Sequence, residues 1–201
     1  CKGEMHITNA KTAELVKLAE NSFRDTNIAF ANELSTICDK FLIDPFELIS
    51  LANKHPRVNI LKPGCGVGGH CIAIDPWFII NSAPEITRLI KTARYVNDKK
   101  PEWVVNKLLK EASAYERNFS KKPTIGCLGL TFKPDIDDMR ESPALEIVKK
   151  LMKKNIDILC CEPNISNHDF IELNDIDTVL ESSDIVAILV AHKQFKKIKF
   201  K

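Results

Sequence analysis

The second half of the chain alternates short apolar runs with helix-forming segments, and this alternation constrains the fold more than any other feature. Ser142-Pro143 has the form of a helix cap followed by a first-turn proline, so a helix is expected over 144–153, with another over 177–182. Strands that alternate with helices pair in parallel. The sequence therefore predicts an α/β, Rossmann-like, doubly wound parallel sheet. Its expected strands are Thr124 to Leu130, Ile156 to Cys161 and Asp184 to Val190.

The first half of the chain is predicted to be helical. Apolar residues recur at three- and four-residue intervals from Thr12 to Phe41, which indicates one long amphipathic helix. Asp44 and Pro45 supply a cap and a first turn for a short helix that reaches about Ala52. The apolar positions of the long helix are Leu15, Leu18, Ala19, Phe23, Ile28, Ala31, Leu34 and Ile37.

A further helix is expected to begin at Pro84 and to reach about Tyr115, with a kink or break at Pro101. The stretch Ser120-Lys121-Lys122-Pro123 that follows has the composition of a linker. The sequence therefore predicts two domains. Residues 1–119 form a helical domain with a glycine-rich loop, and residues 120–201 form the Rossmann-like domain.

The glycine-rich segment from Lys62 to Cys71 is the first candidate for chemistry, because it holds four of the seven glycines of the chain. Glycine lets the backbone turn sharply and approach a ligand closely. His70 and Asp75 flank Cys71 in the sequence, and a thiol becomes a nucleophile when charged neighbours lower its pKa. The alternative is that Cys71 is a small buried hydrophobic residue in an ordinary turn.

Two other groups of polar side chains are candidates for ligand binding. Lys17, Asn21 and Arg24 fall on one side of the long helix, where they either face one ligand or form a solvated surface. Lys133 and Arg140 follow the first strand, and ligands of doubly wound sheets bind at the carboxyl ends of the strands. These cations suit a pyrophosphate or carboxylate ligand. The alternative is an ion pair with a neighbouring carboxylate: Asp137, Asp138 or Glu141.

Composition excludes several classes of protein. The net charge of +2 gives no basis for a nucleic-acid surface, and the basic stretch from Lys193 to Lys201 is expected to be a solvated tail. No apolar run approaches the length of a membrane span and the first residues lack a signal-peptide pattern, so a cytoplasmic protein is expected. Seven cysteines without paired spacing predict reduced thiols and no metal site.

Three motifs together resemble the UDP-glucose/GDP-mannose dehydrogenase family. They are the stretch from Ala13 to Asn21, the glycine segment that ends in Cys71 with Asp75 after it, and Gly129-Leu130-Thr131-Phe132-Lys133-Pro134 through Arg140-Glu141-Ser142. The sequences of residues 55–59 and 68–78 are most similar to those of family members that oxidise UDP-N-acetyl-D-mannosamine. Members that oxidise UDP-glucose typically carry serine at the place of His70 and lysine at the place of Ile74.

The resemblance implies a four-electron oxidation of a sugar C6 alcohol to a carboxylate, with NAD as cofactor and Cys71 as the nucleophile that holds the intermediate. Lys17, Asn21 and Asp75 would be the other catalytic residues. It also implies a homodimer formed through the long central helices, whose apolar face carries Leu15, Phe23, Phe30 and Ile37. The implied contacts with the UDP-sugar are Lys17, Asn21, Arg24, His55, Arg57, Gly68, Phe132 and Lys133, with Arg57 serving a neighbouring subunit, and the implied contact with NAD is Arg140.

The resemblance covers the central and C-terminal parts of the family's architecture. A Gly-x-Gly-x-x-Gly turn after a first strand, typical of the family's NAD-binding domain, does not occur in this sequence, which is therefore expected to be a fragment. Three alternatives stay open: oxidation of UDP-N-acetylglucosamine or UDP-glucose, a non-catalytic module for UDP-sugar binding and dimerisation, and a Cys/His hydrolase. Adjacent residues of an extended loop point apart, which argues against a working pair of His70 and Cys71.

Overall fold

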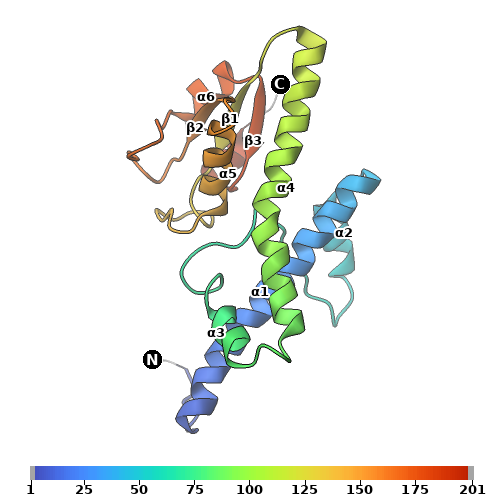
Figure 1. Ribbon diagram of the computed structural model, residues 1–201, viewed down its shortest axis with the longest axis vertical. Coiled ribbons are helices and arrows are strands. Elements are labelled where there is room, and N and C mark those ends of the chain that lie inside the picture. Colours follow the sequence, from blue (N-terminus) through green and yellow to red (C-terminus); the bar gives the residue numbers. More distant parts are fainter. Residues whose placement is uncertain (1–2, 199–201) are drawn as a thin grey trace.

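Two long helices that cross each other organise the computed structural model, which describes residues 3–198 (Figure 1). The helical half is built on α1 and α4, and the upper half of α4 continues alongside the sheet (Figure 1). The elements follow in the order α1 (Ala10–Phe41), α2 (Pro45–Ala52), α3 (Asp75–Ser82), α4 (Arg88–Phe119), β1 (Thr124–Leu128), α5 (Pro143–Met152), β2 (Asp157–Cys161), α6 (Ile176–Ser182), β3 (Ile185–Ile188) and the 3₁₀ helix η1 (Lys193–Lys197).

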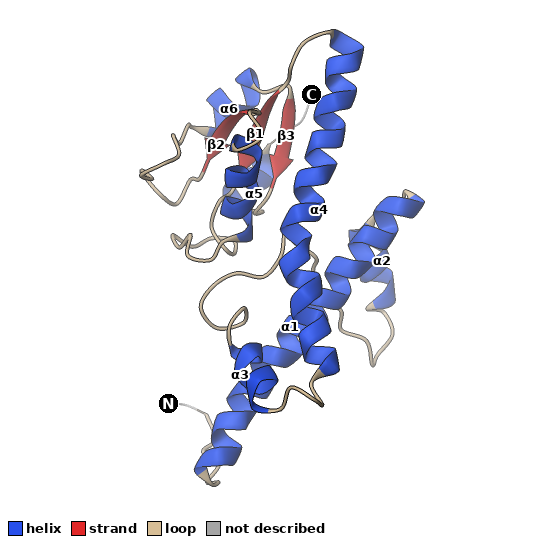
Figure 2. Ribbon diagram, in the orientation of Figure 1, coloured by secondary structure: helices blue, strands red, loops and turns tan. Residues whose placement is uncertain are grey.

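The predicted α/β fold with a parallel sheet is confirmed. The strands form one sheet in the order β2-β1-β3, and both pairs are parallel (Figure 2). Helices cover both faces: Ile125 and Cys127 of β1 pack with residues of α4 and α5, whereas Leu128 packs with Val179 of α6. Both β1 and β3 end two residues earlier than predicted. Gly129 turns the chain at φ 85°, and the amides of residues 189 and 190 converge on the carbonyl of Leu128.

Helix α1 begins two residues before the expected Thr12 because the side chain of Asn9 caps it, accepting a hydrogen bond from the Thr12 amide at 2.9 Å. The face that packs against α4 is polar. Arg94 Nη1 donates to Asp25 Oδ1 at 2.6 Å, and Asn32 Nδ2 donates to Asn97 Oδ1 at 2.9 Å. The predicted apolar positions at 15, 23 and 37, together with Phe30, are exposed instead, so this stripe is not part of the core of the chain.

The helix start expected at Pro84 was wrong, and so was a break at Pro101; a kink at Pro101 stays a prediction. Pro84 lies in a turn that precedes α4, which begins at Arg88. Pro101 is buried inside α4, which continues without a break to Phe119 because it packs against both α1 and α5. The carbonyl that loses its helical partner at this proline belongs to Asn97, and it lies against Gly66, where an added Cβ would be 3.1 Å away.

Helix α3 was not predicted, although Asp75-Pro76 has the form of a helix start. The basic stretch after residue 192 also differs from the expected tail, because η1 buries Phe195 against the sheet. Residues 199–201 of that stretch lie outside the described part of the chain. Within residues 3–198, no helix is long and apolar enough to cross a membrane, no group of side chains could hold a metal ion, and six cysteines are free thiols.

Candidate functional site

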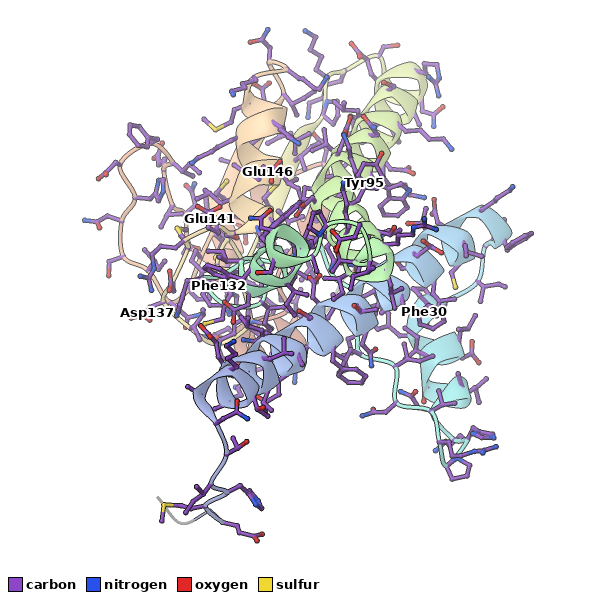
Figure 3. The ribbon with its side chains drawn as sticks, turned by 60° about the horizontal axis from the view of Figure 1, so that its bottom comes forward. Phe30, Tyr95, Phe132, Asp137, Glu141 and Glu146 are labelled. Carbon is purple, nitrogen blue, oxygen red and sulfur yellow. The ribbon has the colours of Figure 1, made fainter. Side chains whose placement is uncertain are left out.

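The glycine segment packs directly on the loop that follows β1, and this contact joins the two halves of the chain. A Cβ at Gly68 would be 2.7 Å from Pro143 Cδ and 2.9 Å from Phe132 Cβ, and one at Gly69 would be 2.8 Å from the ring of Phe132. Only glycine permits so close an approach. Figure 3 shows Phe132 and Glu141 beside α3, the helix that the glycine segment leads into. The ring of Phe132 therefore lies against the segment two residues before Cys71.

Two hydrogen bonds in the structure bring together three of the four predicted catalytic residues. Asn21 is buried on α1 and donates from Nδ2 to Asp75 Oδ2 at 2.5 Å. Asp75 begins α3, and its amide donates to the carbonyl of Cys71 at 2.8 Å, so the carboxylate and the exposed thiol share one turn of chain. Lys17 lies one helical turn before Asn21 and is exposed, with Nζ 3.4 Å from Glu20.

Three other predicted contacts lie apart from this turn or on its margin. Arg24 is exposed on α1. His55 and Arg57 are exposed in the loop after α2, where the Arg57 amide donates to His55 Nδ1 at 3.3 Å. Figure 1 shows α2 on the other side of the crossing helices from α3, so the structure does not bring His55 and Arg57 to Cys71.

Phe132 also lines a cavity of about 710 Å³ between the helical half and the sheet. Its walls include Phe132 and Lys133 from the loop after β1, Lys62 and Cys65 from the glycine segment, and Trp103 from α4. It also reaches Ile188, at the carboxyl end of β3. This is the edge of a parallel sheet where ligands bind.

The charges around the cavity are mostly positive. Lys62, Lys100 and Lys133 line it, against one carboxylate, Asp39. Burial lowers the pKa of Lys100 to about 8, and its ammonium donates to Asn32 O, Ser35 Oγ and Thr36 Oγ1. Because these bonds use all three of its donors, Lys100 contributes charge rather than a direct contact. Burial also raises the pKa of the neighbouring Cys65 thiol to about 11, which keeps it protonated and unreactive.

The two cations predicted after β1 have different surroundings. Lys133 is exposed at the mouth of the cavity, with Nζ 5.6 Å from the centre of the Phe132 ring. Arg140 makes the ion pair that was the alternative to ligand binding: Nη2 donates to Asp138 Oδ2 at 2.6 Å. Hydrogen bonds from Arg140 hold the pKa of Asp138 at about 2. A Cβ at Gly68 would overlap the carbonyl oxygen of Glu141, so the Arg140 loop lies beside the glycine segment.

Sequence reasoning missed two sets of residues at this site. Lys62 was noted only as the start of the glycine segment, although it lines the same cavity as Lys133. Glu162 and His192 were not considered, and they lie buried behind the loop that carries Phe132. A signal existed for both, since each follows a predicted strand at its carboxyl end.

Two sequence models of one family match the chain. The central domain of the UDP-glucose/GDP-mannose dehydrogenase family matches residues 11–99, and the UDP binding domain of that family matches residues 126–201. The chain is 56% identical to UDP-N-acetyl-D-mannosamine dehydrogenase of Campylobacter jejuni, over 98% of this chain and 49% of that protein. It is 51% identical to NDP-N-acetyl-D-galactosaminuronic acid dehydrogenase of Ralstonia solanacearum, over 98% and 47%.

Solved structures agree with these matches. UDP-D-ManNAc dehydrogenase from Pyrococcus horikoshii superposes with a TM-score of 0.85 at 39% identity, over 98% of this chain and 46% of that one. UDP-N-acetyl-mannosamine dehydrogenase from S. aureus gives 0.84 at 43% identity, over 98% and 46%. The chain spans about half the length of the curated relatives it matches. The two matched domains, which together span most of its sequence, show that the chain belongs to the UDP-glucose/GDP-mannose dehydrogenase family.

Proposed function

We propose that this chain supplies the UDP-binding site and the catalytic cysteine of an NAD-dependent 6-dehydrogenase that oxidises UDP-N-acetyl-D-mannosamine to UDP-N-acetyl-D-mannosaminuronate, a polysaccharide precursor. One observation carries the proposal: Gly68 and Gly69, shortly before the exposed thiol of Cys71, pack on Phe132, which lines a cavity together with three lysines. The relatives support the choice of substrate, because UDP-N-acetyl-D-mannosamine dehydrogenases match at 50% identity or more.

The geometry suits an extended nucleotide sugar. A cavity of about 710 Å³ can hold the UDP part, with Phe132 as its apolar wall and the ammonium groups of Lys62 and Lys133 facing the diphosphate. The sugar would then pass the ring of Phe132 and the backbone of Gly68 to reach Cys71. Arg24, on the exposed side of α1, is an outer contact in this arrangement.

The chemistry centres on Cys71. When bound, NAD supplies the oxidation, since two molecules in succession each accept one hydride from C6. After the first oxidation the Cys71 thiolate adds to the C6 aldehyde and forms a C–S bond, which holds the reactive carbonyl on the protein as a thiohemiacetal. After the second oxidation the same bond is a thioester. Attack by water then breaks the C–S bond, which releases the carboxylate and regenerates the thiolate.

The neighbours of Cys71 have separate roles in these steps. Asp75 accepts the proton of the attacking water, and its carboxylate is held in place by the 2.5 Å hydrogen bond from Asn21. The Nζ of Lys17 stabilises the oxyanion that forms at C6 when the thiolate or water adds. Its exposed pair with Glu20 is weak, so the side chain is free to turn to the substrate.

The fit to NAD rests on Arg140. Its Nη1 makes no hydrogen bond within residues 3–198 and the guanidinium is exposed, so it can meet a pyrophosphate while Nε and Nη2 keep Asp138. The glycine segment does not fit a dinucleotide, because it follows a loop rather than a strand. Among the site residues predicted for this chain, only Arg140 would therefore contact NAD.

A homodimer completes the proposal. Val16, Phe23, Phe30 and Ile37 lie seven residues apart on α1, and all are exposed. Such a stripe can pack against its symmetry mate. Because His55 and Arg57 lie apart from Cys71 in one chain, they would serve the site of the neighbouring subunit.

A second UDP-sugar dehydrogenase activity has one supporting observation, the 51% identity to an NDP-N-acetyl-D-galactosaminuronic acid dehydrogenase. A non-catalytic role in UDP-sugar binding and dimerisation is the other alternative. The Cys/His hydrolase has no geometric support, because no hydrogen bond joins His70 and Cys71 within the described residues.

The test joins this chain to an NAD-binding domain of the family and measures NADH and uronate together. The proposal predicts that two NADH form for each molecule of UDP-N-acetyl-D-mannosamine. It also predicts that the Cys71→Ala variant does not reach the wild-type rate of uronate formation. His70→Ala is the control and should keep turnover. Uronate formed at the wild-type rate by Cys71→Ala would contradict the role of the thiol, and loss of NADH and uronate formation in His70→Ala would show that His70 also takes part in the oxidation.

A further inference from the structure

Two buried ionisable residues meet at the carboxyl edge of the sheet and take no part in the proposed chemistry. Glu162 directly follows β2 and is 3% exposed, and His192 follows β3 and is fully buried. His192 Nε2 lies 3.0 Å from Glu162 Oε2. Between them and the cavity runs the loop Thr131–Asp135, which carries Phe132 and Lys133.

Glu162 holds the beginning of this loop. Its Oε2 accepts hydrogen bonds from the amides of Leu130 at 2.7 Å and Thr131 at 3.2 Å, directly before Phe132. Its Oε1 accepts from the amide and the side chain of Asn164, at 3.0 and 3.2 Å. Every partner of the carboxylate is a donor, so both oxygens act as acceptors.

His192 holds the end of the same loop. The Asp135 amide donates to His192 Nδ1 at 2.9 Å, so this nitrogen carries a lone pair. The Asn164 side chain also faces Nδ1 at 3.0 Å. The ring proton therefore sits on Nε2 and is donated to Glu162. Within the loop, Thr131 Oγ1 donates to the carbonyl of Lys133 at 2.9 Å. This bond connects the beginning of the loop to Lys133 at the mouth of the cavity.

We propose that Glu162 and His192 are positioning residues for UDP recognition: they clamp both ends of the Thr131–Asp135 loop and so fix Phe132 and Lys133 against the cavity. The inference deepens the proposed function and rests on it for the identity of the ligand. The two ends are held by residues that follow two different strands, so a shift of the loop breaks a buried hydrogen bond at its beginning or a partly buried one at its end. An unpaired buried group is costly, which makes the loop rigid before the ligand arrives.

Two substitutions of His192 separate the clamp from simple packing. Asn at this position can place its amide oxygen where Nδ1 lies, which keeps an acceptor for the Asp135 amide and gives up the bond to Glu162. Gln reaches the place of Nε2 with its NH₂ group, which keeps the bond to Glu162 and leaves the Asp135 amide without an acceptor. Both variants lose the ring, so they differ mainly in which end of the loop is released.

The experiment titrates UDP into the wild-type chain and into His192→Asn and His192→Gln by calorimetry, with amide hydrogen exchange of residues 131–135 measured alongside. The clamp predicts that His192→Gln weakens UDP binding about tenfold and accelerates exchange at Asp135, as loss of one buried hydrogen bond would, while His192→Asn stays closer to wild type in both. Equal UDP affinity and equal exchange in the two folded variants would overturn the clamp.

The two proposals fail separately. If the folded wild-type chain does not bind UDP, the proposed function is contradicted, and the clamp is then judged by exchange alone. Faster exchange of the Asp135 amide in His192→Gln than in His192→Asn would still support a positioned loop. Slow exchange in both variants would overturn it.

Discussion

Replacement of Gly68 by alanine tests the contact on which the whole site is built. An added Cβ would lie well inside contact distance of the Glu141 carbonyl oxygen, 2.7 Å from Pro143 Cδ and 2.9 Å from Phe132 Cβ. Two of these three neighbours are backbone or a proline ring, which cannot move aside alone. The glycine segment and the loop after β1 must therefore separate by about 1 Å to regain normal contact.

The expected cost follows from this overlap. Overpacking by one methyl group against rigid neighbours destabilises a protein by about 1–3 kcal/mol. For a chain of this size that corresponds to a fall in Tm of about 2–4 °C for each kcal/mol. Separation of the Cys71 turn from Phe132 should also affect catalysis more than folding, since a misplacement of about 1 Å can reduce turnover on the order of 100-fold.

Thermal unfolding by circular dichroism measures the first effect, and turnover with an attached NAD-binding domain measures the second. Gly64→Ala is the matched control for unfolding, because a Cβ there would meet only the Gly66 carbonyl at 4.0 Å and its amide would still reach Asn32. Gly64 also lines the cavity, so the turnover of Gly68→Ala is compared with that of the wild type. A Gly68→Ala variant with the Tm of Gly64→Ala and the turnover of the wild type would refute the packing described for Phe132.

Three further predictions concern single side chains. Asn21→Ala should lower kcat about 100-fold with little change in KM, because the donor to Asp75 Oδ2 is lost; an unchanged kcat in steady-state assays would contradict that role. Burial lowers the pKa of Lys100 to about 8, so its charged form opposes folding. The free energy of unfolding of the wild type should therefore rise relative to that of Lys100→Met as pH rises from 8 to 9. Urea melts that give the same pH dependence of this free energy for both proteins would contradict the prediction. The pKa of Asp184 is lowered to about 2, mainly by the hydrogen bond from the Thr124 amide. Asp184 should therefore stabilise the fold above pH 4 and lose this effect as pH falls toward 2. An Asp184→Asn variant with the same midpoint of acid unfolding as the wild type would disprove this.

Local signals in the sequence predicted most of the second half. Ser142 caps α5 by accepting from the Leu145 amide at 3.3 Å, and Asp44 caps α2 in the same way at 2.8 Å. Cap residues and apolar runs act over a few positions, so they can be read without knowledge of the fold. The continuous course of α4 through Pro101 could not be read in this way, because packing against α1 and α5 outweighs a lost hydrogen bond.

The site was predicted in part. Cys71, Asp75 and Asn21 were chosen from motifs, and the 2.5 Å hydrogen bond between Asn21 and Asp75 joins residues 54 positions apart in the chain. The contact of Gly68 with Glu141 and the clamp at His192 depend on how two halves of the chain meet. No spacing within either half encodes such contacts, so they required the structure.

The central claim is that the folded chain recognises a UDP-sugar through the cavity beside Phe132 and Lys133. Calorimetric titration of the chain with UDP-N-acetyl-D-mannosamine tests it most directly, with Lys133→Ala as the site variant and Lys110→Ala, on the exposed face of α4, as the control. The account predicts saturable binding by the wild type and the control, and affinity about tenfold weaker for Lys133→Ala, the loss of one charge-assisted contact. No binding by the folded wild-type chain, or equal binding by Lys133→Ala, would contradict the claim.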